Sequence, residues 1–249
     1  MTAQRVLVTG AGSGIGRATA ECFARDGASV VVCDVRGDAA AEVADALGDA
    51  CVAVQCDVSD EDSVAHAMMV GGQRFGGLDS VVGAAGIVMG GPAHEMSSEE
   101  WHDLVRVNLT GMFFTVKHAL RHLLAAGGGS LVTVGSVGSL VAAGRSAAYD
   151  ATKGGVVQLT RGIAAEYAEH GIRANCVCPG HVSTNLAANS EGVYGASVTP
   201  AGPQRRTIPP VPRAGSPEEI AKVIAFLCSP SASFMTGTAV PVDGGYTAV

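Results

Sequence analysis

The chain has 249 residues, of which 47% are hydrophobic and 16% charged, and its formal net charge is -7. This apolar content excludes an intrinsically disordered protein, and the acidic balance offers no basic surface for nucleic acid or for a membrane. Because no apolar run reaches transmembrane length and the N-terminus shows no signal-peptide pattern, we expect one cytoplasmic domain over residues 1–249 that binds a small molecule.

Short runs rich in β-branched residues alternate with longer, Ala-rich helical segments along the chain. The runs are apolar throughout, which is typical of strands buried on both faces. The alternation predicts an α/β fold, a single doubly wound Rossmann domain in which helices cover both faces of a parallel sheet. The predicted strands are 5–9, 29–34, 50–56, 78–82, 130–134, 172–177 and 238–242.

A glycine-rich turn, TGAGSGIG at 9–16, follows the first predicted strand and opens a helix. Glycines permit a tight turn there and let backbone N–H groups approach a pyrophosphate at the helix N-terminus. We therefore expect this turn to bind the phosphates of a dinucleotide. The candidate residues are Gly10, Ser13, Gly14, Ile15 and Gly16.

Asp34 ends the second predicted strand, where a carboxylate accepts hydrogen bonds from the adenosine ribose and repels a 2′-phosphate. The residue therefore favours NAD over NADP. Arg36, two positions later, leaves the alternative open, because its guanidinium could pair with that phosphate.

The third and fourth predicted strands also end in candidate ligand-binding residues. Asp57 and Val58 follow the third strand, and Ala84, Ala85 and Gly86 follow the fourth. Ligands of open α/β sheets bind at the carboxyl ends of the strands, so we expect both segments to face the cofactor. Asp57 could accept the adenine amino group, or it could cap the next helix.

Tyr149 and Lys153 are four residues apart in a predicted helix, which places both side chains on one helix face. Ser136, at the carboxyl end of the fifth predicted strand, precedes Tyr149 by thirteen positions. A phenol has an ordinary pKa near 10, and a neighbouring lysine ammonium favours its phenolate. We therefore expect Tyr149 to exchange protons at a reacting oxygen, with His94 and His181 as polar residues of the same pocket.

The seven cysteines include no CxxC pair, so we expect reduced structural thiols and no metal site. Cys176 and Cys178 alternate along a predicted strand, and we expect their side chains to face opposite sides of it. Residues 185–213 show neither helical nor strand periodicity and contain several prolines. We interpret this segment as a substrate-binding loop.

The ordered set of motifs resembles the short-chain dehydrogenase/reductase family over essentially the whole chain. The matching elements are TGAGSGIG at 9–16, Asp57-Val58, VNLTG at 107–111, Ser136, YDATK at 149–153, PGHVST at 179–184 and VDGG at 242–245. The resemblance implies a seven-stranded parallel sheet and a homotetramer.

The family's roles carry over residue by residue. Asn108 would hold a water that links Lys153 to solvent, Ser136 would donate to the substrate oxygen, and Tyr149 would exchange its proton. Lys153 would also hold the nicotinamide ribose. The nicotinamide end of the cofactor would contact Pro179, Gly180, Val182 and Thr184.

The chain departs from the family pattern at two places. It has Gly83-Ala84-Ala85-Gly86 where the family usually carries Asn-Asn-Ala-Gly, which puts the rigidity of this segment in doubt. Gly135 stands before Ser136 where the family often has a second serine, so proton donation rests on Ser136, with Ser139 as a remote substitute.

These observations predict an NAD-dependent oxidoreductase that moves hydride between a secondary alcohol or ketone and nicotinamide. One alternative is an NADP-dependent 3-oxoacyl-thioester reductase. Another, of a different class, is a dinucleotide-binding regulatory protein that kept the fold without the chemistry. The sequence leaves the identity of the alcohol open.

Overall fold

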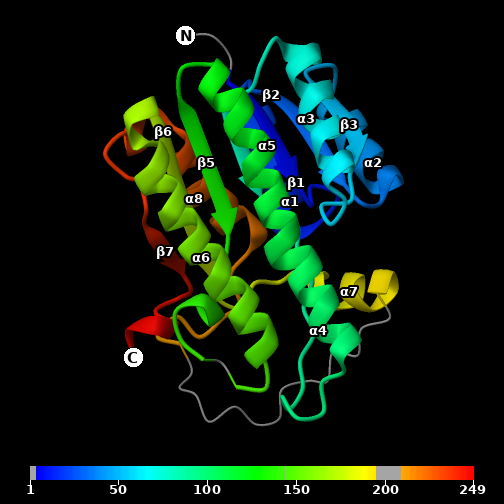
Figure 1. Ribbon diagram of the computed structural model, residues 1–249, viewed down its shortest axis with the longest axis vertical. Helices are drawn as coiled ribbons and strands as arrows, with labels where there is room; N and C mark the ends of the chain where they lie inside the picture. Colours follow the sequence, from blue (N-terminus) through cyan, green and yellow to red (C-terminus); the bar gives the residue numbers. More distant parts are fainter. Residues whose placement is uncertain (1–3, 143, 195–208) are drawn as a thin grey trace.

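Seven parallel strands form one sheet in the computed structural model, which describes residues 4–142, 144–194 and 209–249 (Figure 1). Their order is β3-β2-β1-β4-β5-β6-β7, so the order reverses between β1 and β4. The strands are β1 (Arg5–Thr9), β2 (Ser29–Asp34), β3 (Cys51–Gln55), β4 (Ser80–Gly83), β5 (Gly129–Val134), β6 (Ile172–Pro179) and β7 (Ala239–Val242).

The predicted strands are confirmed with small shifts at their ends. The bounds of β1 and β2 match the prediction, whereas β4 begins two residues later than expected and β6 continues two residues further. The extension of β6 follows from its partner β7, because Cys178 pairs with Pro241 and Pro179 pairs with Val242.

Helices cover both faces of the sheet, as predicted, and each face has its own apolar core. Alternate side chains of a strand point to opposite faces: Val30 and Val32 belong to one core, Val31 and Cys33 to the other. The first core lies beneath α1 (Gly14–Arg25), α2 (Gly37–Leu47) and α8 (Pro217–Cys228). The second lies beneath α3 (Glu61–Phe75), α5 (Gly111–Ala125) and α6 (Ala147–Tyr167).

Two further helices lie at the carboxyl end of the sheet (Figure 1). Helix α4 (Ser98–Leu104) starts with a capping box, and six residues of π-helix, Val105–Thr110, join it to α5. Helix α7 (Leu186–Tyr194) lies inside the predicted 185–213 loop, so the prediction of irregular structure is wrong for this part. Its apolar and polar residues form no clear stripe, which is why periodicity missed it; residues 195–208 lie outside the described part of the chain.

Cys176 and Cys178 lie on the same face of β6, with their Sγ atoms 4.0 Å apart. The expectation of opposite faces is wrong because residues two positions apart on a strand share a face. Within the described residues, no group of three or more His, Cys, Asp or Glu side chains is placed to hold a metal ion.

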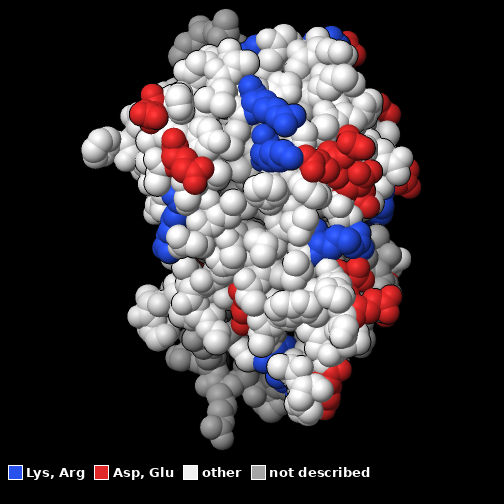
Figure 2. Space-filling view, viewed as in Figure 1, with Lys and Arg blue, Asp and Glu red and all other residues white. Residues whose placement is uncertain are grey.

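Acidic and basic side chains are interspersed on the face of the molecule drawn in Figure 2, around a broad uncharged area. Among the residues that the structure describes, no helix combines the length and the apolar character needed to cross a membrane.

Helix α6, which carries Tyr149 and Lys153, is attached to the sheet by a buried pair of hydroxyl groups. The Oγ1 atoms of Thr133 on β5 and Thr160 on α6 are 2.7 Å apart, and both residues are fully buried. Thr160 Oγ1 also donates to the Val156 carbonyl. The pair fixes the position of α6 relative to the end of β5.

We expect Thr160→Val to lower the free energy of unfolding by about 1–3 kcal/mol, because it leaves the Thr133 hydroxyl buried without this partner. The double variant Thr133→Val/Thr160→Val should recover most of that loss, since both polar groups are then removed. Urea unfolding of the unmodified chain, Thr160→Val, Thr133→Val and the double variant measures the cycle. Strictly additive losses would show that the two hydroxyls do not interact.

Candidate active site

A cavity of about 360 Å³ opens at the carboxyl end of the sheet, where the strand order reverses between β1 and β4. Such a reversal leaves a crevice between neighbouring loops. The cavity is lined by every residue that the sequence analysis proposed for cofactor binding: Gly10, Ser13, Gly14, Ile15, Gly16, Asp34, Asp57, Val58, Ala84, Ala85, Gly86, Tyr149, Lys153, Pro179, Gly180, Val182 and Thr184. Ser136 lines it as well, whereas Asn108 lies buried behind the wall.

The glycine-rich turn brings the backbone of β1 close to its neighbours. Gly10 has a φ of 66°, and a Cβ there would lie 2.8 Å from the Ala85 Cα. A Cβ at Gly16 would collide with the Gly10 carbonyl oxygen. Only glycine permits this approach, and the N-terminus of α1 at Gly14 thereby borders the cavity. Free N–H groups and the helix dipole favour an anion at this position.

Asp34 connects the end of β2 to the same turn. Its Oδ2 accepts a hydrogen bond from the Gly12 N–H at 2.9 Å, and its Oδ1 accepts one from the Arg36 N–H at 3.0 Å. The residue is 6% exposed and borders the cavity. The Arg36 guanidinium lies 3.7 Å from the carboxylate, on the cavity wall. The Asp34 carboxylate and the Arg36 guanidinium, which bear on the choice between NAD and NADP, therefore lie side by side at the cavity wall.

Asp57 does not cap the following helix. Its Oδ1 accepts hydrogen bonds from the N–H and the hydroxyl of Ser59, at 2.9 and 2.7 Å. The N-cap of α3 is Asp60, whose side chain accepts from the Asp62 N–H. The capping alternative for Asp57 is therefore wrong, and its side chain lies at the cavity wall.

Tyr149 on α6 and Ser136, just after β5, are neighbours in the wall of the cavity, and their side chains form a hydrogen bond. Burial raises the pKa of Tyr149 to about 12, the hydrogen bond with Ser136 acts in the opposite direction, and the negative charge of Asp150 raises it further. The Ser136 Oγ accepts the Gly138 N–H at 3.1 Å. This bond uses an oxygen lone pair, so the Ser136 proton stays available for the hydrogen bond with Tyr149.

Lys153 lies 5.8 Å from the centroid of the Tyr149 ring, on the same face of α6 as expected. Its Nζ donates to the Val134 carbonyl at 3.0 Å, and the residue is 4% exposed. Burial lowers the pKa of Lys153 to about 8. Desolvation thus moves both groups toward their neutral forms, and the expected stabilisation of the phenolate by the lysine is not among the causes that shift the pKa of Tyr149.

Asn108 lies in the π-helical segment and is fully buried. Its Oδ1 accepts the Ile87 N–H at 2.8 Å, and its Nδ2 donates to the Ile87 carbonyl at 2.9 Å. A Cβ at Gly86 would lie 3.1 Å from Asn108 Oδ1 and 3.2 Å from Lys153 Nζ. The amide oxygen and the ammonium group therefore border the same small space above Gly86, which a larger residue would fill.

Several lining residues escaped the sequence analysis. Asn189 and Ser190 of α7 are bonded across the cavity: Asn189 Nδ2 donates to Ser13 Oγ, and Ser190 Oγ accepts the Val88 N–H, both at 3.0 Å. No local motif marks these two residues. The others are Val35, Cys56, Ile87, Val88, Val107, Val134, Gly135, Leu186 and Ala187.

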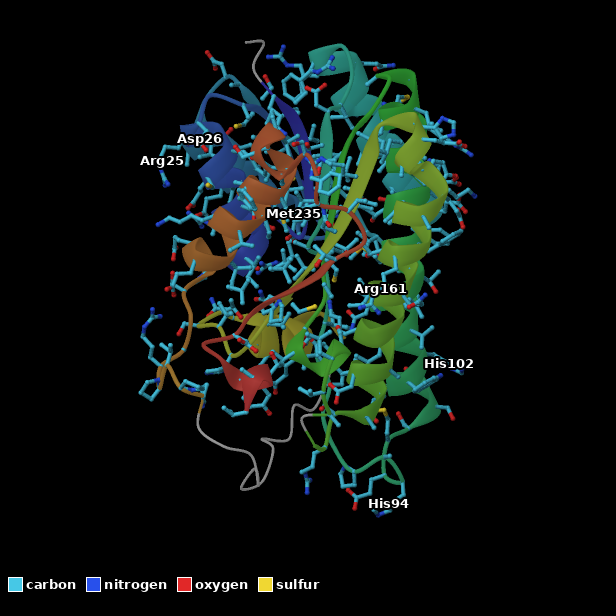
Figure 3. The ribbon with its side chains drawn as sticks, turned by 90° about the vertical axis from the view of Figure 1, so that its left-hand side faces the viewer. Arg25, Asp26, His94, His102, Arg161 and Met235 are labelled. Carbon is cyan, nitrogen blue, oxygen red and sulfur yellow. The ribbon has the colours of Figure 1, made fainter. Side chains whose placement is uncertain are left out.

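Of the two histidines expected near the pocket, His181 lines the cavity. His94 does not, because its side chain is 81% exposed and extends from the loop before α4, at the end of the molecule (Figure 3). The expectation for His94 is therefore wrong.

Comparisons with known proteins agree with this geometry. A family model described as "Enoyl-(Acyl carrier protein) reductase" matches residues 10–247. The cis-4-hydroxycyclohexanecarboxylate dehydrogenase of Sinomonas cyclohexanicum is 46% identical, covering 99% of this chain and 98% of that protein. The cyclohexanol dehydrogenase of an Acinetobacter species is 39% identical, covering 97% and 94%. The chain belongs to the short-chain dehydrogenase/reductase family. It is an oxidoreductase.

A solved structure supports the same assignment. The 3-ketoacyl-(acyl-carrier-protein) reductase of Brucella melitensis, complexed with NADH, superimposes with a TM-score of 0.87 at 32% identity, and covers 98% of each chain. The resemblance stated from the sequence and the predicted Rossmann fold are thereby confirmed.

The first departure of this short-chain dehydrogenase/reductase from its family has a steric cause. A Cβ at Gly83 would lie 2.5 Å from the Met112 sulfur, so an asparagine does not fit there. The Thr9 Oγ1 accepts the N–H groups of Ala84 and Ala85 instead, at 3.2 and 3.3 Å. This hydroxyl connects β1 to the segment after β4.

The second departure is steric as well. A Cβ at Gly135 would lie 2.9 Å from Cys176 Sγ and 3.0 Å from Ser139 Oγ, so a serine has no room. Ser139 does not replace it: its hydroxyl donates to the Lys153 carbonyl at 2.8 Å and accepts the Ser136 N–H at 3.1 Å. These two hydrogen bonds connect Ser139 to the strand end and to α6, and of the two serines Ser136 is the one that lines the cavity.

We expect Asn108→Ala to lower the free energy of unfolding by about 1–3 kcal/mol, because both backbone groups of Ile87 lose their buried partner. The exposed Asn185→Ala is the matched control and should change stability by less than about 0.5 kcal/mol. Urea unfolding measures both variants. Equal stability of the two would contradict a bridging role for the Asn108 amide.

Proposed function

We propose that this protein is an NAD-dependent dehydrogenase that transfers hydride between nicotinamide and a secondary alcohol or its ketone. The observation that carries the proposal is one cavity that joins two parts. A glycine cradle with Asp34 lies at one end, and Ser136, Tyr149 and Lys153 lie at the other. Named relatives act on cyclic secondary alcohols, so we take cyclohexanol and its relatives as the first substrate class.

The residues present fit a dinucleotide. The close backbone contacts of Gly10 and Gly16 leave room where side chains would otherwise block a pyrophosphate. Ser13 and the α1 N-terminus would hold the phosphates, and Asp34 would accept the ribose hydroxyls. Pro179, Gly180, Val182 and Thr184 would surround the carboxamide, and Asp57, Val58 and 84–86 the adenine side. When bound, NAD supplies the carbon that accepts the hydride.

The chain's own groups handle the proton. Ser136 would donate to the substrate oxygen, and the Tyr149 oxygen would take the hydroxyl proton during oxidation or return it during reduction. Because the pKa of Tyr149 is about 12, the phenolate is rare at neutral pH. Positive charge placed beside the ring favours that form. Lys153, bonded to Val134, would hold the nicotinamide ribose, and Asn108 would orient a water between Lys153 and solvent.

The chemistry of the reacting end favours an apolar substrate. Ile87, Val88 and Leu186 contribute to the cavity wall near α7. A 3-oxoacyl-thioester reductase is the second candidate, because a solved relative with that activity shares the fold and was complexed with NADH. In an NADP-dependent form of this reductase, the Arg36 guanidinium beside Asp34 would pair with the 2′-phosphate.

We also propose that the enzyme works as a homotetramer in the cytoplasm. Large apolar side chains are exposed on α4 and α5, among them Trp101 at 43% and Phe113 at 47%, and the uncharged area of Figure 2 extends over the α5 and α6 side. Exposed apolar patches favour contact between copies. All seven cysteines are free thiols, which suits a reducing compartment. Sedimentation analysis of the purified chain measures the assembly.

We expect Tyr149→Phe to lower the rate of NAD reduction with cyclohexanol by about 10²–10⁴-fold, because the proton acceptor is lost. NAD binding, measured by calorimetry, should persist. The control is Tyr167→Phe on the same helix, which should keep near-normal turnover. Normal turnover in Tyr149→Phe would refute the mechanism, and no turnover by the intact chain across a broad panel of secondary alcohols would favour a non-catalytic dinucleotide-binding protein.

We expect Asp34→Ala to raise the ratio of kcat/KM for NADP to that for NAD by at least about tenfold, equivalent to ~1.4 kcal/mol. The variant removes both the ribose acceptor and the charge that repels a 2′-phosphate. Asp45→Ala, an exposed carboxylate on α2, is the matched control. An unchanged ratio would rule out Asp34 as the residue that selects the cofactor.

A further inference from the structure

Two buried thiols lie directly behind the wall of the cavity, and the reaction proposed above does not use them. Cys176 and Cys178 are at most 1% exposed, and their Sγ atoms face the same side of β6 at 4.0 Å. A disulfide requires about 2.05 Å between its sulfur atoms. By contrast, two sulfurs bound to one atom at ~2.3 Å lie about 3.3–3.8 Å apart, for bond angles from the right angle of a pyramidal centre to the tetrahedral angle. The pair is spaced for one bridging atom.

Gly135 separates the two sulfurs from the cavity, and it has no side chain. A Cβ at this glycine would lie 2.9 Å from Cys176 Sγ and 3.2 Å from Cys178 Sγ. Gly135 itself lines the cavity. Only the backbone of Gly135 therefore lies between a small neutral molecule in the cavity and the two thiols.

The surroundings make one of the two sulfurs easier to deprotonate. The hydrogen bond from Cys178 lowers the pKa of Cys176, and Thr133 and the positive charge of Lys153 act in the same direction against burial. The pKa of Cys178 is raised by the same hydrogen bond and by burial. One sulfur is thus the better nucleophile, and its neighbour completes a chelate.

We propose that Cys176 and Cys178 form a dithiol site that captures trivalent arsenicals and thereby inactivates the enzyme. With an arsenoxide R–As=O, the two thiols form two As–S bonds, the As=O bond breaks, and the oxygen leaves with both thiol protons as one water. Arsenic keeps its oxidation state, so neither an oxidant nor a reductant is required.

Two features favour an arsenical over a metal cation. Within the described residues, no third His, Cys, Asp or Glu completes a group that could hold a metal, whereas arsenic that carries one organic substituent needs only two sulfurs. The Lys153 ammonium also interacts with both thiols and would repel a dication. A neutral arsenical meets no such repulsion.

Inactivation follows from the position of the bridge. The adduct would lie against Gly135, which precedes the proton donor Ser136, and beside Lys153. Its substituent would extend past Gly135 into the space of the reacting groups. The inhibition rests on the function proposed above, but formation of the adduct does not, so the two are measured separately.

Binding is tested on the full chain with phenylarsine oxide, followed by intact mass and by titration of accessible thiols after unfolding. We expect one adduct per chain that protects two thiols, is reversed by 2,3-dimercaptopropanol, and is weakened at least about 100-fold in Cys176→Ser and in Cys178→Ala, since each removes the chelate. Cys56→Ser is the matched control, because Cys56 is also buried and lines the cavity. It should retain the adduct.

The proposal is overturned if the Cys176 and Cys178 variants, shown to be folded by circular dichroism, bind phenylarsine oxide as the unmodified chain does, or if Cys56→Ser removes the adduct. Protection of the same thiols by Cd²⁺ at equal concentration would also overturn it in favour of a metal site. In the activity measurement, phenylarsine oxide should abolish NAD reduction by the unmodified chain, whereas Cys178→Ala, which does not form the adduct at the same concentration, should stay active. An adduct with full turnover would overturn the inactivation.

Discussion

A lysine that is 4% exposed must find its hydrogen-bond partners inside the protein, and much of the site is arranged around this requirement. Lys153 donates to the Val134 carbonyl at the end of β5. Gly86 leaves space between its ammonium group and the amide of Asn108, and the π-helical segment brings that amide to Ile87. Such π-bulges occur frequently at functional sites. The same burial lowers the pKa of Lys153 to about 8, so the group responds readily to a charge that enters the cavity.

The opposite end of the cavity depends on close approach of the backbone and not on charge burial. Gly10 and Gly16 allow β1, α1 and the segment after β4 to meet at distances that exclude any side chain. The Thr9 hydroxyl then connects β1 to that segment through two N–H groups. The two ends are built on different principles, and the parallel sheet holds them at a fixed separation because both extend from the carboxyl ends of its strands.

Apolar runs and glycine patterns were enough to predict the sheet, since strands buried on both faces leave a continuous signal that survives without an alignment. The cavity lining was predictable wherever a motif follows a strand end, as at Asp34 or Ser136. Prediction failed where the determinant is a contact between distant segments. No sequence pattern near Asn189 indicates its hydrogen bond to Ser13. The glycine at position 83 is required because the Met112 side chain occupies the space that a side chain would need. The Cys176 and Cys178 error was one of strand geometry, not of missing information.

Helix α7 is connected to the rest of the cavity wall by two side-chain hydrogen bonds, from Asn189 to Ser13 and from Val88 to Ser190. Each is worth about 1 kcal/mol, so together they reduce the fraction of molecules with α7 lifted by about thirty-fold. A bound dinucleotide would dissociate only when α7 is in this rare open position. These two hydrogen bonds, neither of which involves a reacting group, would thus set the residence time of the cofactor. The residence time in turn limits the rate of turnover.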